Sequence, residues 1–376
     1  MARFRSFAVF LLQSAVLGLA VAFLIVFFNP GLLPGAASER AAGAYRQASY
    51  AAAVAASAPA VVSIYTERVV TEPDSRSILG LVPGYETPML TRVERSLGSG
   101  VIVHSDGYVL TNNHVVEEAA GIRVQLADGR IADPKVVGTD RDTDLAVLRI
   151  ELEDVPVMPL GRSDTLEVGD VVLAIGNSFG LSQTVTLGIV SGTGRGQLGV
   201  STFENFIQTD AAINFGNSGG ALVDTSGRMV GVNTARLSEQ LLSDVPEGIG
   251  FAIPVNLAAG VMQQIIEHGR VIRGYLGVAL RDLTPRRAEL LGLEDAEGLE
   301  IIGVAADSPA ARAGLRVGDV LTHVGGRPVQ FRRDAVSLIA RMSPGETVEL
   351  EISRRGKAFE MAAGIEERPT EGGSSN

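Results

Sequence analysis

The sequence predicts a mostly β protein, with one apolar helix at the N-terminus and a smaller mixed domain at the C-terminus. Between residues 60 and 235, short runs rich in Val, Ile, Leu and Thr recur every ~8 to 15 residues. They are AVVSIYT, SGVIVH, GYVLTN, IRVQLA, LAVLRI, DVVLAI, TVTLGIVSG, GALVD and RMVGVNTA. Turns such as SDG and ADG separate these runs, so we expect a barrel or sandwich and not alternating βα units.

The composition is that of an ordinary globular protein. The chain has 376 residues, 46% hydrophobic and 20% charged, enough for two or three domains with full cores. Acidic side chains outnumber basic ones by 43 to 32 without any basic run, so we expect no nucleic acid partner. The lack of cysteine excludes disulfides and thiolate zinc sites, and no His pair has ligand spacing, so we expect no metal and no cofactor.

Residues 7–28 read FAVFLLQSAVLGLAVAFLIVFF, which is about the ~20 apolar residues needed to cross a bilayer. Arg3 and Arg5 precede this stretch and no basic residue follows until Arg40, so the positive-inside bias predicts a single-pass anchor with the rest of the chain exported. A cleaved signal peptide is the alternative, with small residues at 35–37 suited to cleavage, but its apolar core is usually only ~7 to 15 residues long. A buried core helix is disfavoured because no face of the stretch is polar.

Four further segments follow the predicted anchor. Residues 29–58 are rich in Ala, Ser, Gly and Pro and are predicted to be a spacer. The β-rich domain is expected at 59–269 and ends with a helix at 254–268, which has Pro254 near its start and Gly269 after its end. A second domain is expected at 271–366, with short helices at SPAARAG and near 332–341, before a disordered tail at 367–376.

The run GNSGG at 216–220 places Ser218 among small residues that leave its hydroxyl uncrowded. The backbone N–H groups of Gly216 and Ser218 are candidates for an oxyanion hole, in which each donor lowers the barrier by about 3 kcal/mol. A glycine-rich turn without function fits this motif equally well when it is taken alone. Further residues are needed to decide between the two interpretations.

A nucleophilic serine needs a base, and the chain has only four histidines. His268 ends a predicted helix, His323 lies beside two glycines, and His104 opens a tight turn, so each of them has a structural explanation. His114 follows the strand GYVL at an edge where a side chain can face a cleft, and we favour it as the general base.

Asp144 is the candidate that orients this base. It directly precedes the apolar run LAVLRI, where burying a charge costs free energy unless the charge is hydrogen-bonded. Asp140 and Asp142, in contrast, are expected to be solvated in a turn. GNSGG also fits the α/β-hydrolase motif, but there the order is Ser, acid, His. The order His114, Asp144, Ser218 over strands is that of chymotrypsin-like double β-barrel serine proteases.

Longer motifs extend this interpretation. LGSGVIV, GYVLTNNHVV, DTDLAVLRI, GDVVLAIGN, QTDAAINFGNSGGALVD, GIGFAIP and RVIRGYLGV resemble the HtrA family of serine proteases, in order, between residues 60 and 365. The run DSPAARAGLRVGDVLTHVGGRPV resembles the PDZ domain of that family. The resemblance implies a trypsin-like serine endopeptidase with one PDZ domain, assembled as a homotrimer.

The resemblance also assigns roles to further residues. Asn233, Thr234 and Ala235 match the strand that pairs with the substrate backbone, and Arg195 and Gln208 match positions that couple the PDZ domain to the active site. Tyr275, Leu276, Gly277 and Val278 match the loop whose N–H groups bind a peptide's C-terminal carboxylate. A small or medium aliphatic residue before the cut is expected in a pocket near Ala212 and Ala235.

Within the family, the anchor, the single PDZ domain and the run EHGRVIRGYLG are most similar to a stress sensor of the bacterial inner membrane, with its domains in the periplasm. This implies cleavage of a membrane-associated anti-sigma factor when the PDZ domain binds C-termini of unfolded outer-membrane proteins. A general periplasmic quality-control protease and an inactive PDZ-bearing scaffold are the alternatives. Two features depart from the family pattern: Phe215 replaces a common Pro, and the loop at 67–95 is longer.

Overall fold

The first sheet collects the apolar runs between residues 61 and 149 of the computed structural model. The structure describes residues 2–28, 49–73, 89–177, 183–196, 198, 203–214, 216–235, 248–291, 293 and 297–369. The strands are β1 (Val61–Pro73), β2 (Met89–Ile102), β3 (Tyr108–Thr111), β4 (Gly121–Gln125), β5 (Ile131–Ala132), β6 (Lys135–Asp140) and β7 (Leu145–Arg149). Their order is β5-β4-β1-β2-β3-β7-β6. Branched apolar side chains such as Ile64, Ile102 and Leu148 fill the core on one face.

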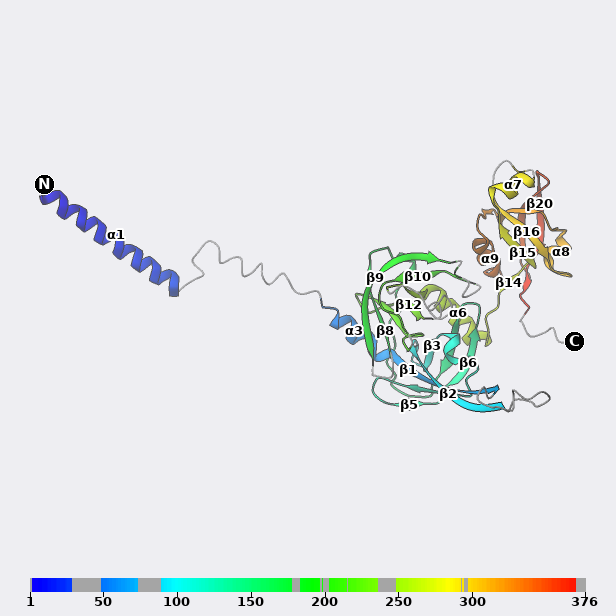
Figure 1. Ribbon diagram of the computed structural model, residues 1–376, viewed down its shortest axis with the longest axis horizontal. Coiled ribbons are helices and arrows are strands. Elements are labelled where there is room, and N and C mark those ends of the chain that lie inside the picture. The colour runs from blue at the N-terminus through cyan, green and yellow to red at the C-terminus, as the bar shows by residue number, and fades with distance from the viewer. Residues whose placement is uncertain are drawn as a thin grey trace, which may run out of the picture. The chain divides into compact units, whose positions relative to one another are not determined.

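The second sheet closes on itself into a barrel, coloured green in Figure 1. Its strands are β8 (Val171–Gly176), β9 (Thr184–Arg195), β10 (Phe206–Thr209), β11 (Ala221–Asp224), β12 (Met229–Thr234) and β13 (Gly250–Pro254), in the order β10-β13-β12-β11-β8-β9. Helix α6 (Val255–His268) follows β13, and Gly269 ends it in a left-handed conformation with φ 73°. Of the two barrels predicted, this one closes, whereas the first sheet ends at the two-residue strand β5 and at β6.

All nine predicted β runs lie in strands, but the strands β5, β6, β10 and β13 were not among those predicted. In the region at 67–95, expected as a long loop, the described residues 67–73 and 89–95 form a two-stranded ribbon. β1 and β2 stay paired from Glu67 and Arg95 to Pro73 and Met89, and the ribbon projects from the first sheet in Figure 1. Alternating β-branched and charged residues such as Val69 and Val93 explain why this segment is extended. Residues 74–88 lie outside the described residues.

The described part of the C-terminal domain is a separate β unit with three short helices. Its strands are β14 (Gly274–Tyr275), β15 (Val278–Asp282), β16 (Leu299–Val304), β17 (Val320–Val324), β18 (Arg327–Pro328), β19 (Thr347–Arg354), β20 (Lys357–Gly364) and β21 (Glu366–Glu367). Its helices are α7 (Pro285–Leu290), α8 (Pro309–Ala313) and α9 (Arg332–Ala340). Ser308 caps α8 at its start and Gly314 ends it, as the run SPAARAG predicts. Strand β15 lies at one edge of the main sheet.

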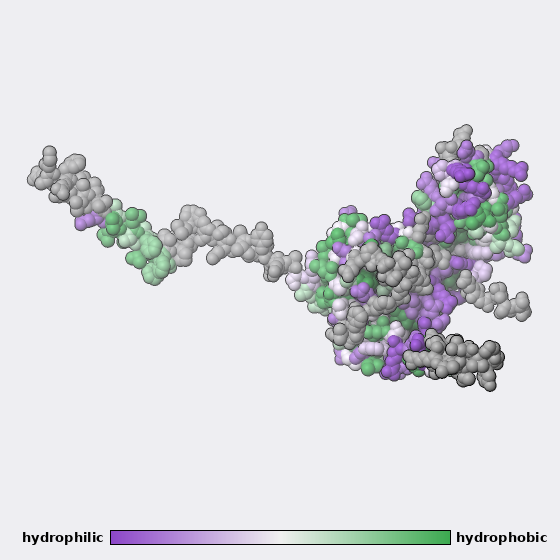
Figure 2. Space-filling view, in the orientation of Figure 1, coloured by the Kyte–Doolittle hydropathy of each residue, from purple (hydrophilic) through white to green (hydrophobic). Residues whose placement is uncertain are grey.

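The N-terminal segment forms helix α1 (Ala2–Phe28). Its described side chains begin at Gln13 and are mostly apolar, as Figure 2 shows. Within the described part of the chain, no helix reaches the length and hydropathy of a membrane span. The segment predicted as a spacer ends in helix α3 (Ala51–Ser57) and the turn η2 (Ala58–Ala60), because the alanine run AAAVAAS favours a helix.

Candidate active site

His114 and Asp144 come together where the first sheet approaches the barrel. His114 lies in the one-turn helix α4 (Asn113–Val116) directly after β3, and Asp144 directly precedes β7. The Nδ1 atom of His114 lies 2.7 Å from Oδ2 of Asp144, and the backbone N–H of His114 donates to Oδ1 at 3.0 Å. The carboxylate therefore holds both the ring and the main chain of the histidine, the arrangement that fixes an imidazole's tautomer in serine proteases.

Asp144 itself is held in an unusual conformation by its neighbours. Its φ is 58°, which is rare for a residue other than glycine. The N–H of Asn113 and the side-chain amide of Asn112 both donate to its carbonyl oxygen, at 3.1 and 3.0 Å. The Thr234 hydroxyl lies 3.4 Å from Oδ2. The carboxylate is buried but has polar partners, which offsets the cost of its desolvation.

Ser218 is buried on the barrel side of the same region. Its Oγ accepts a hydrogen bond from the N–H of Ala235 at 2.9 Å, and Ala235 follows the threonine that contacts Asp144. Among the described residues, no hydrogen bond joins Ser218 to His114. In this conformation the serine hydroxyl is thus held by the barrel main chain and not by the imidazole.

The turn at 216–220, which contains Ser218 and is called the nucleophile turn below, depends on glycine. Gly216 and Gly219 have φ angles of 95° and 82°, which other residues rarely adopt. A side chain at Gly219 would also collide with the carbonyl oxygen of Ser99 and the hydroxyl of Thr111. Among the described residues, no hydrogen bond from the N–H of Gly216 or from that of Ser218 is found. Phe215, the departure from the family pattern, lies outside the described residues.

Asn233 has a different position from the one that the family resemblance implies. Its N–H donates to the carbonyl oxygen of Gly220 at 2.9 Å, and its own carbonyl accepts from the N–H of Gly219 at 2.8 Å. Both main-chain groups therefore support the nucleophile turn and cannot pair with a substrate. The cause is tertiary, since β12 lies beside this turn, and only residues from Thr234 onward remain as candidates for substrate pairing.

Asp140 is not solvated, which corrects the expectation for this residue. It is 6% exposed and accepts hydrogen bonds from both terminal nitrogens of Arg273, which is 9% exposed, one of them at 2.7 Å. Thr143 also donates to it. Asp142 lies 3.6 Å from Arg273 and accepts from Arg368 at 3.2 Å. The burial of Asp140 could not be predicted from the sequence, because Arg273 lies far along the chain and no local pattern indicates that it contacts this turn.

The residues assigned to regulation and to peptide binding are also located. Arg195 donates through Nε to Oε1 of Gln208 at 2.8 Å, which joins β9 to β10. Tyr275 and Val278 flank the turn between β14 and β15, where Gly277 has a φ of 85°. The carbonyls of Leu276 and Gly277 accept from Ala310 and Ala305, whereas their N–H groups donate to no described backbone group outside the strands.

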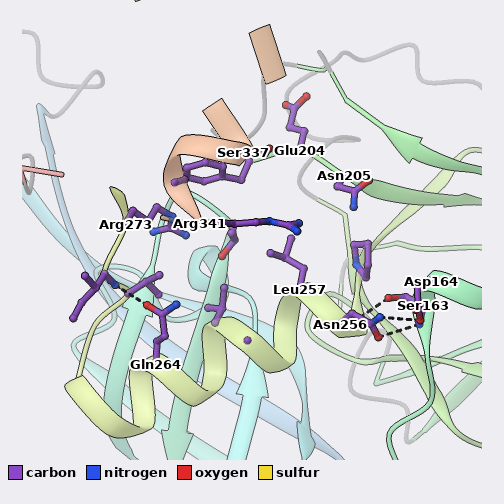
Figure 3. A pocket seen from close by; sticks show the side chains of 18 of the residues that line it. Ser163, Asp164, Glu204, Asn205, Asn256, Leu257, Gln264, Arg273, Ser337 and Arg341 are labelled. Atoms are coloured by element: carbon purple, nitrogen blue, oxygen red, sulfur yellow. Dashed lines mark hydrogen bonds between the residues drawn. The ribbon is translucent and has the colours of Figure 1, made fainter. Parts of the chain in front are cut away.

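A cavity of about 1000 Å³ lies along helix α6, and His114, Asp144 and Ser218 are not among the residues that line it. Figure 3 shows Leu257 and Gln264 projecting from α6, near Arg341 and Ser337. Asn256 is held at its rim by Ser163 and Asp164. Within the described residues, no group of three or more His, Cys, Asp or Glu side chains is placed to hold a metal ion.

Comparisons with known proteins match both domains. Residues 98–232 match the family model described as a trypsin-like peptidase domain, and residues 274–363 match the model described as a PDZ domain. The chain is 38% identical over 364 residues to the serine endoprotease DegS of Escherichia coli (strain K12), covering 96% of this chain and 98% of DegS. It is 47% identical over 278 residues to a probable periplasmic serine endoprotease DegP-like of Chlamydia trachomatis serovar D, covering 74% of this chain and 55% of that protein.

Solved structures give the same family. The structure titled HtrA-type protease AlgW with decapeptide is 48% identical and has a TM-score of 0.75, covering 86% of this chain and 99% of that chain. A serine endoprotease from Yersinia pestis is 40% identical with a TM-score of 0.65, covering 85% of this chain and 98% of that chain. The predicted family resemblance is therefore confirmed: the chain belongs to the HtrA family of serine proteases and is a serine endopeptidase with a trypsin-like domain and a PDZ domain.

Proposed function

We propose that this chain is a regulatory serine endopeptidase of the periplasm that cuts a membrane-associated protein when its PDZ domain binds a protein C-terminus. The observation that carries the proposal is a contact between two regions: Arg333 of α9 donates to the carbonyl oxygen of Gly194 at 3.2 Å. Gly194 directly precedes Arg195, whose side chain bonds Gln208 in the barrel. A movement of α9 in the PDZ domain can therefore be transmitted through Gly194 and Arg195 to the strand pair β9 and β10.

In the protease domain, assigned to residues 59–269, Ser218 is the nucleophile, His114 the general base and Asp144 its orienter. His114 takes the hydroxyl proton as Oγ attacks the scissile carbonyl, and Asp144 stabilises the imidazolium that forms. The N–H groups of Gly216 and Ser218 bind the resulting oxyanion. Because Ser218 Oγ is bonded to Ala235 in this conformation, attack requires the hydroxyl to turn toward His114.

In the PDZ domain, assigned to residues 271–366, a peptide would add as a strand beside the edge strand β15. The N–H groups of Leu276 and Gly277 would bind its terminal carboxylate, since neither donates to a described backbone group outside the strands. Two related solved structures are titled as the HtrA-type protease AlgW with a decapeptide and with a tripeptide. The C-termini of unfolded outer-membrane proteins are the proposed ligands, and an anti-sigma factor is the proposed substrate.

We also propose that residues 7–28 anchor the chain in the bacterial inner membrane and that it works as a homotrimer. The anchor is supported by the apolar stretch that follows two arginines. Self-association is supported by an exposed apolar row on β9, in which Val185, Leu187 and Ile189 are 38%, 58% and 39% exposed. A relative is named as a probable periplasmic protease, which supports the compartment.

The test measures reporter cleavage by the full chain in detergent, with a peptide ending in an apolar residue and with the same peptide amidated at its C-terminus. A coupling of about 1 to 3 kcal/mol gives roughly 5- to 150-fold activation by the free-acid peptide alone. Arg333→Gln should raise the basal rate at least about twofold and shrink the activation, whereas the matched change Arg332→Gln should do neither. If peptide binding is confirmed but no rate changes, the PDZ domain only docks proteins and the quality-control function becomes the better explanation.

A further inference from the structure

Ser99 is a buried residue of β2 that touches the nucleophile turn of the other sheet. It is 0% exposed, and all of its polar groups are bonded. Its N–H donates to the carbonyl oxygen of Ser218 at 2.8 Å, and its Oγ donates to the carbonyl oxygen of Gly216 at 2.6 Å. Its carbonyl accepts from the Thr111 hydroxyl at 2.7 Å. A single serine thus contacts the carbonyls of both residues whose N–H groups form the proposed oxyanion hole.

The direction of the Ser99 hydroxyl proton is determined by a second neighbour. The N–H of Asn177 donates to Ser99 Oγ at 2.8 Å, so this oxygen already accepts a hydrogen bond from that side. A hydroxyl carries only one proton, and among the described residues the carbonyl that Oγ bonds is that of Gly216. The N–H of Asn177 therefore orients the Ser99 hydroxyl so that its proton is donated to the carbonyl of Gly216 in the turn.

These bonds limit how the turn can move. A peptide group is planar, so holding a carbonyl also fixes the N–H of the following residue. Ser99 fixes the peptide groups after Gly216 and after Ser218, and the carbonyl of Asn217, between them, accepts from Gly220 at 3.0 Å. Three consecutive peptide groups are thus held, and the N–H of Ser218 belongs to the middle one. The N–H of Gly216 is attached to the first of them through a single α-carbon.

We propose that Ser99 is a positioning residue that aligns the oxyanion donors through the carbonyls of Gly216 and Ser218, an inference that rests on the proposed roles of those residues. It touches no reacting atom and acts only on the turn. The alternative is that Ser99 merely fills a buried polar position between the two sheets. The two alternatives differ in one respect: a positioning residue affects the binding of a tetrahedral adduct more than the binding of a substrate.

The test replaces Ser99 by alanine in the full chain and compares it with Ser57→Ala. Ser57 is also 0% exposed, but its hydroxyl donates within helix α3, to the carbonyl of Ala53 at 2.8 Å. We expect Ser99→Ala to lower kcat by roughly 10- to 100-fold with KM nearly unchanged, less than the ~10² to 10³ lost when an oxyanion donor is removed outright. Ser57→Ala should leave kcat within about twofold while lowering stability by a similar amount.

A second readout uses a peptide boronic acid, which forms a tetrahedral adduct with the serine, beside the matching peptide amide. Ser99→Ala should weaken the boronate by the same factor as kcat/KM and leave amide binding unchanged. Ser99→Cys, in which a weak thiol donor replaces the hydroxyl, should show the same pattern and serves if the alanine variant does not fold. Equal losses for boronate and amide, or an unchanged kcat, would overturn the proposal. Full activity of Ser218→Ala would instead refute the catalytic assignment itself.

Discussion

Asp140 and Arg273 form an almost completely buried ion pair that joins the turn before Asp144 to the segment between α6 and β14. Both terminal nitrogens of the guanidinium reach the carboxylate, and the Thr143 hydroxyl donates to the same group. The guanidinium also lies 4.6 Å from the centre of the Phe203 ring. Thr143, which directly precedes the proposed catalytic Asp144, is thereby linked through Asp140 to Arg273 at the start of the PDZ domain.

Removing one member of this pair should destabilise the chain strongly. Arg273→Met leaves Asp140 as an uncompensated buried charge, which costs about 3 to 5 kcal/mol, and adding Asp140→Leu should recover most of that loss. Denaturant unfolding provides the measurement. The exposed pair of Lys135 and Glu151 is the control, since Lys135→Met should cost below about 1 kcal/mol. Similar losses from the two single changes would contradict a special role for the buried pair.

Ser218→Ala should abolish peptide cleavage while the fold is preserved. The nucleophile and its base act as a unit, so we expect a loss of at least about 10³-fold in kcat. Cleavage of a reporter peptide is measured beside circular dichroism, with Ser57→Ala as the buried-serine control. A variant that keeps even a tenth of the normal rate would rule out the proposed mechanism.

Gly219→Ala should impair both stability and catalysis. The residue has a φ of 82°, and a β-carbon there would collide with Ser99 and Thr111, so the turn must shift. Gly129 is a matched control because its φ is 90° but open space surrounds it. Both changes carry the cost of the left-handed conformation, about 1 to 3 kcal/mol, but only Gly219→Ala should lower kcat. Equal kcat values for the two variants would mean that the turn tolerates displacement.

Stability of the PDZ domain should fall in acid through Glu300. A side-chain hydrogen bond from Arg287, with a further one from Arg281, holds the pKa of this buried carboxyl below its ordinary value. Because the folded pKa is the lower one, the stabilisation is present above the unfolded value of about 4.3 and is lost as the pH falls below it.

Glu300→Gln should therefore remove part of the pH dependence that sets in as the pH falls below about 4.3, and it should lower stability at neutral pH. Amide hydrogen exchange in β15, β16 and β17 gives a measure that is local to this domain. An unchanged pH dependence would show that Glu300 does not contribute in this way.

Protein recovered from cells should remain in the membrane fraction after a carbonate wash and should begin within the first few residues of the sequence. Both expectations follow from an uncleaved apolar segment at 7–28. Fractionation and N-terminal sequencing provide the measurements. A mature chain that begins near Ser38 would identify the segment as a signal peptide and would favour the quality-control function.

Much of the fold could be predicted from local patterns. The nine β runs, helix α6 and the capped helix α8 each carry their signal within a few residues, as alternating apolar positions or as a Pro, Ser or Gly at an end. His114, Asp144 and Ser218 could be selected for a similar reason, because each stands at the end of a strand or in a glycine turn, where side chains from separate segments can meet. Chain order then distinguished the double-barrel proteases from the α/β-hydrolases.

The rest depended on contacts between segments far apart in the chain. Nothing local to Asp140 indicates the arginine that buries it, and nothing local to Asn233 indicates that the nucleophile turn occupies its main chain. Ser99 is an ordinary strand residue until two sheets are packed together, when its hydroxyl meets the carbonyl of Gly216. Local patterns therefore predict most of the elements and the catalytic candidates, because these depend on residue type and short-range geometry. Which polar groups are bonded follows from the packing of distant segments, because hydrogen bonds and buried charges require partners that only packing supplies.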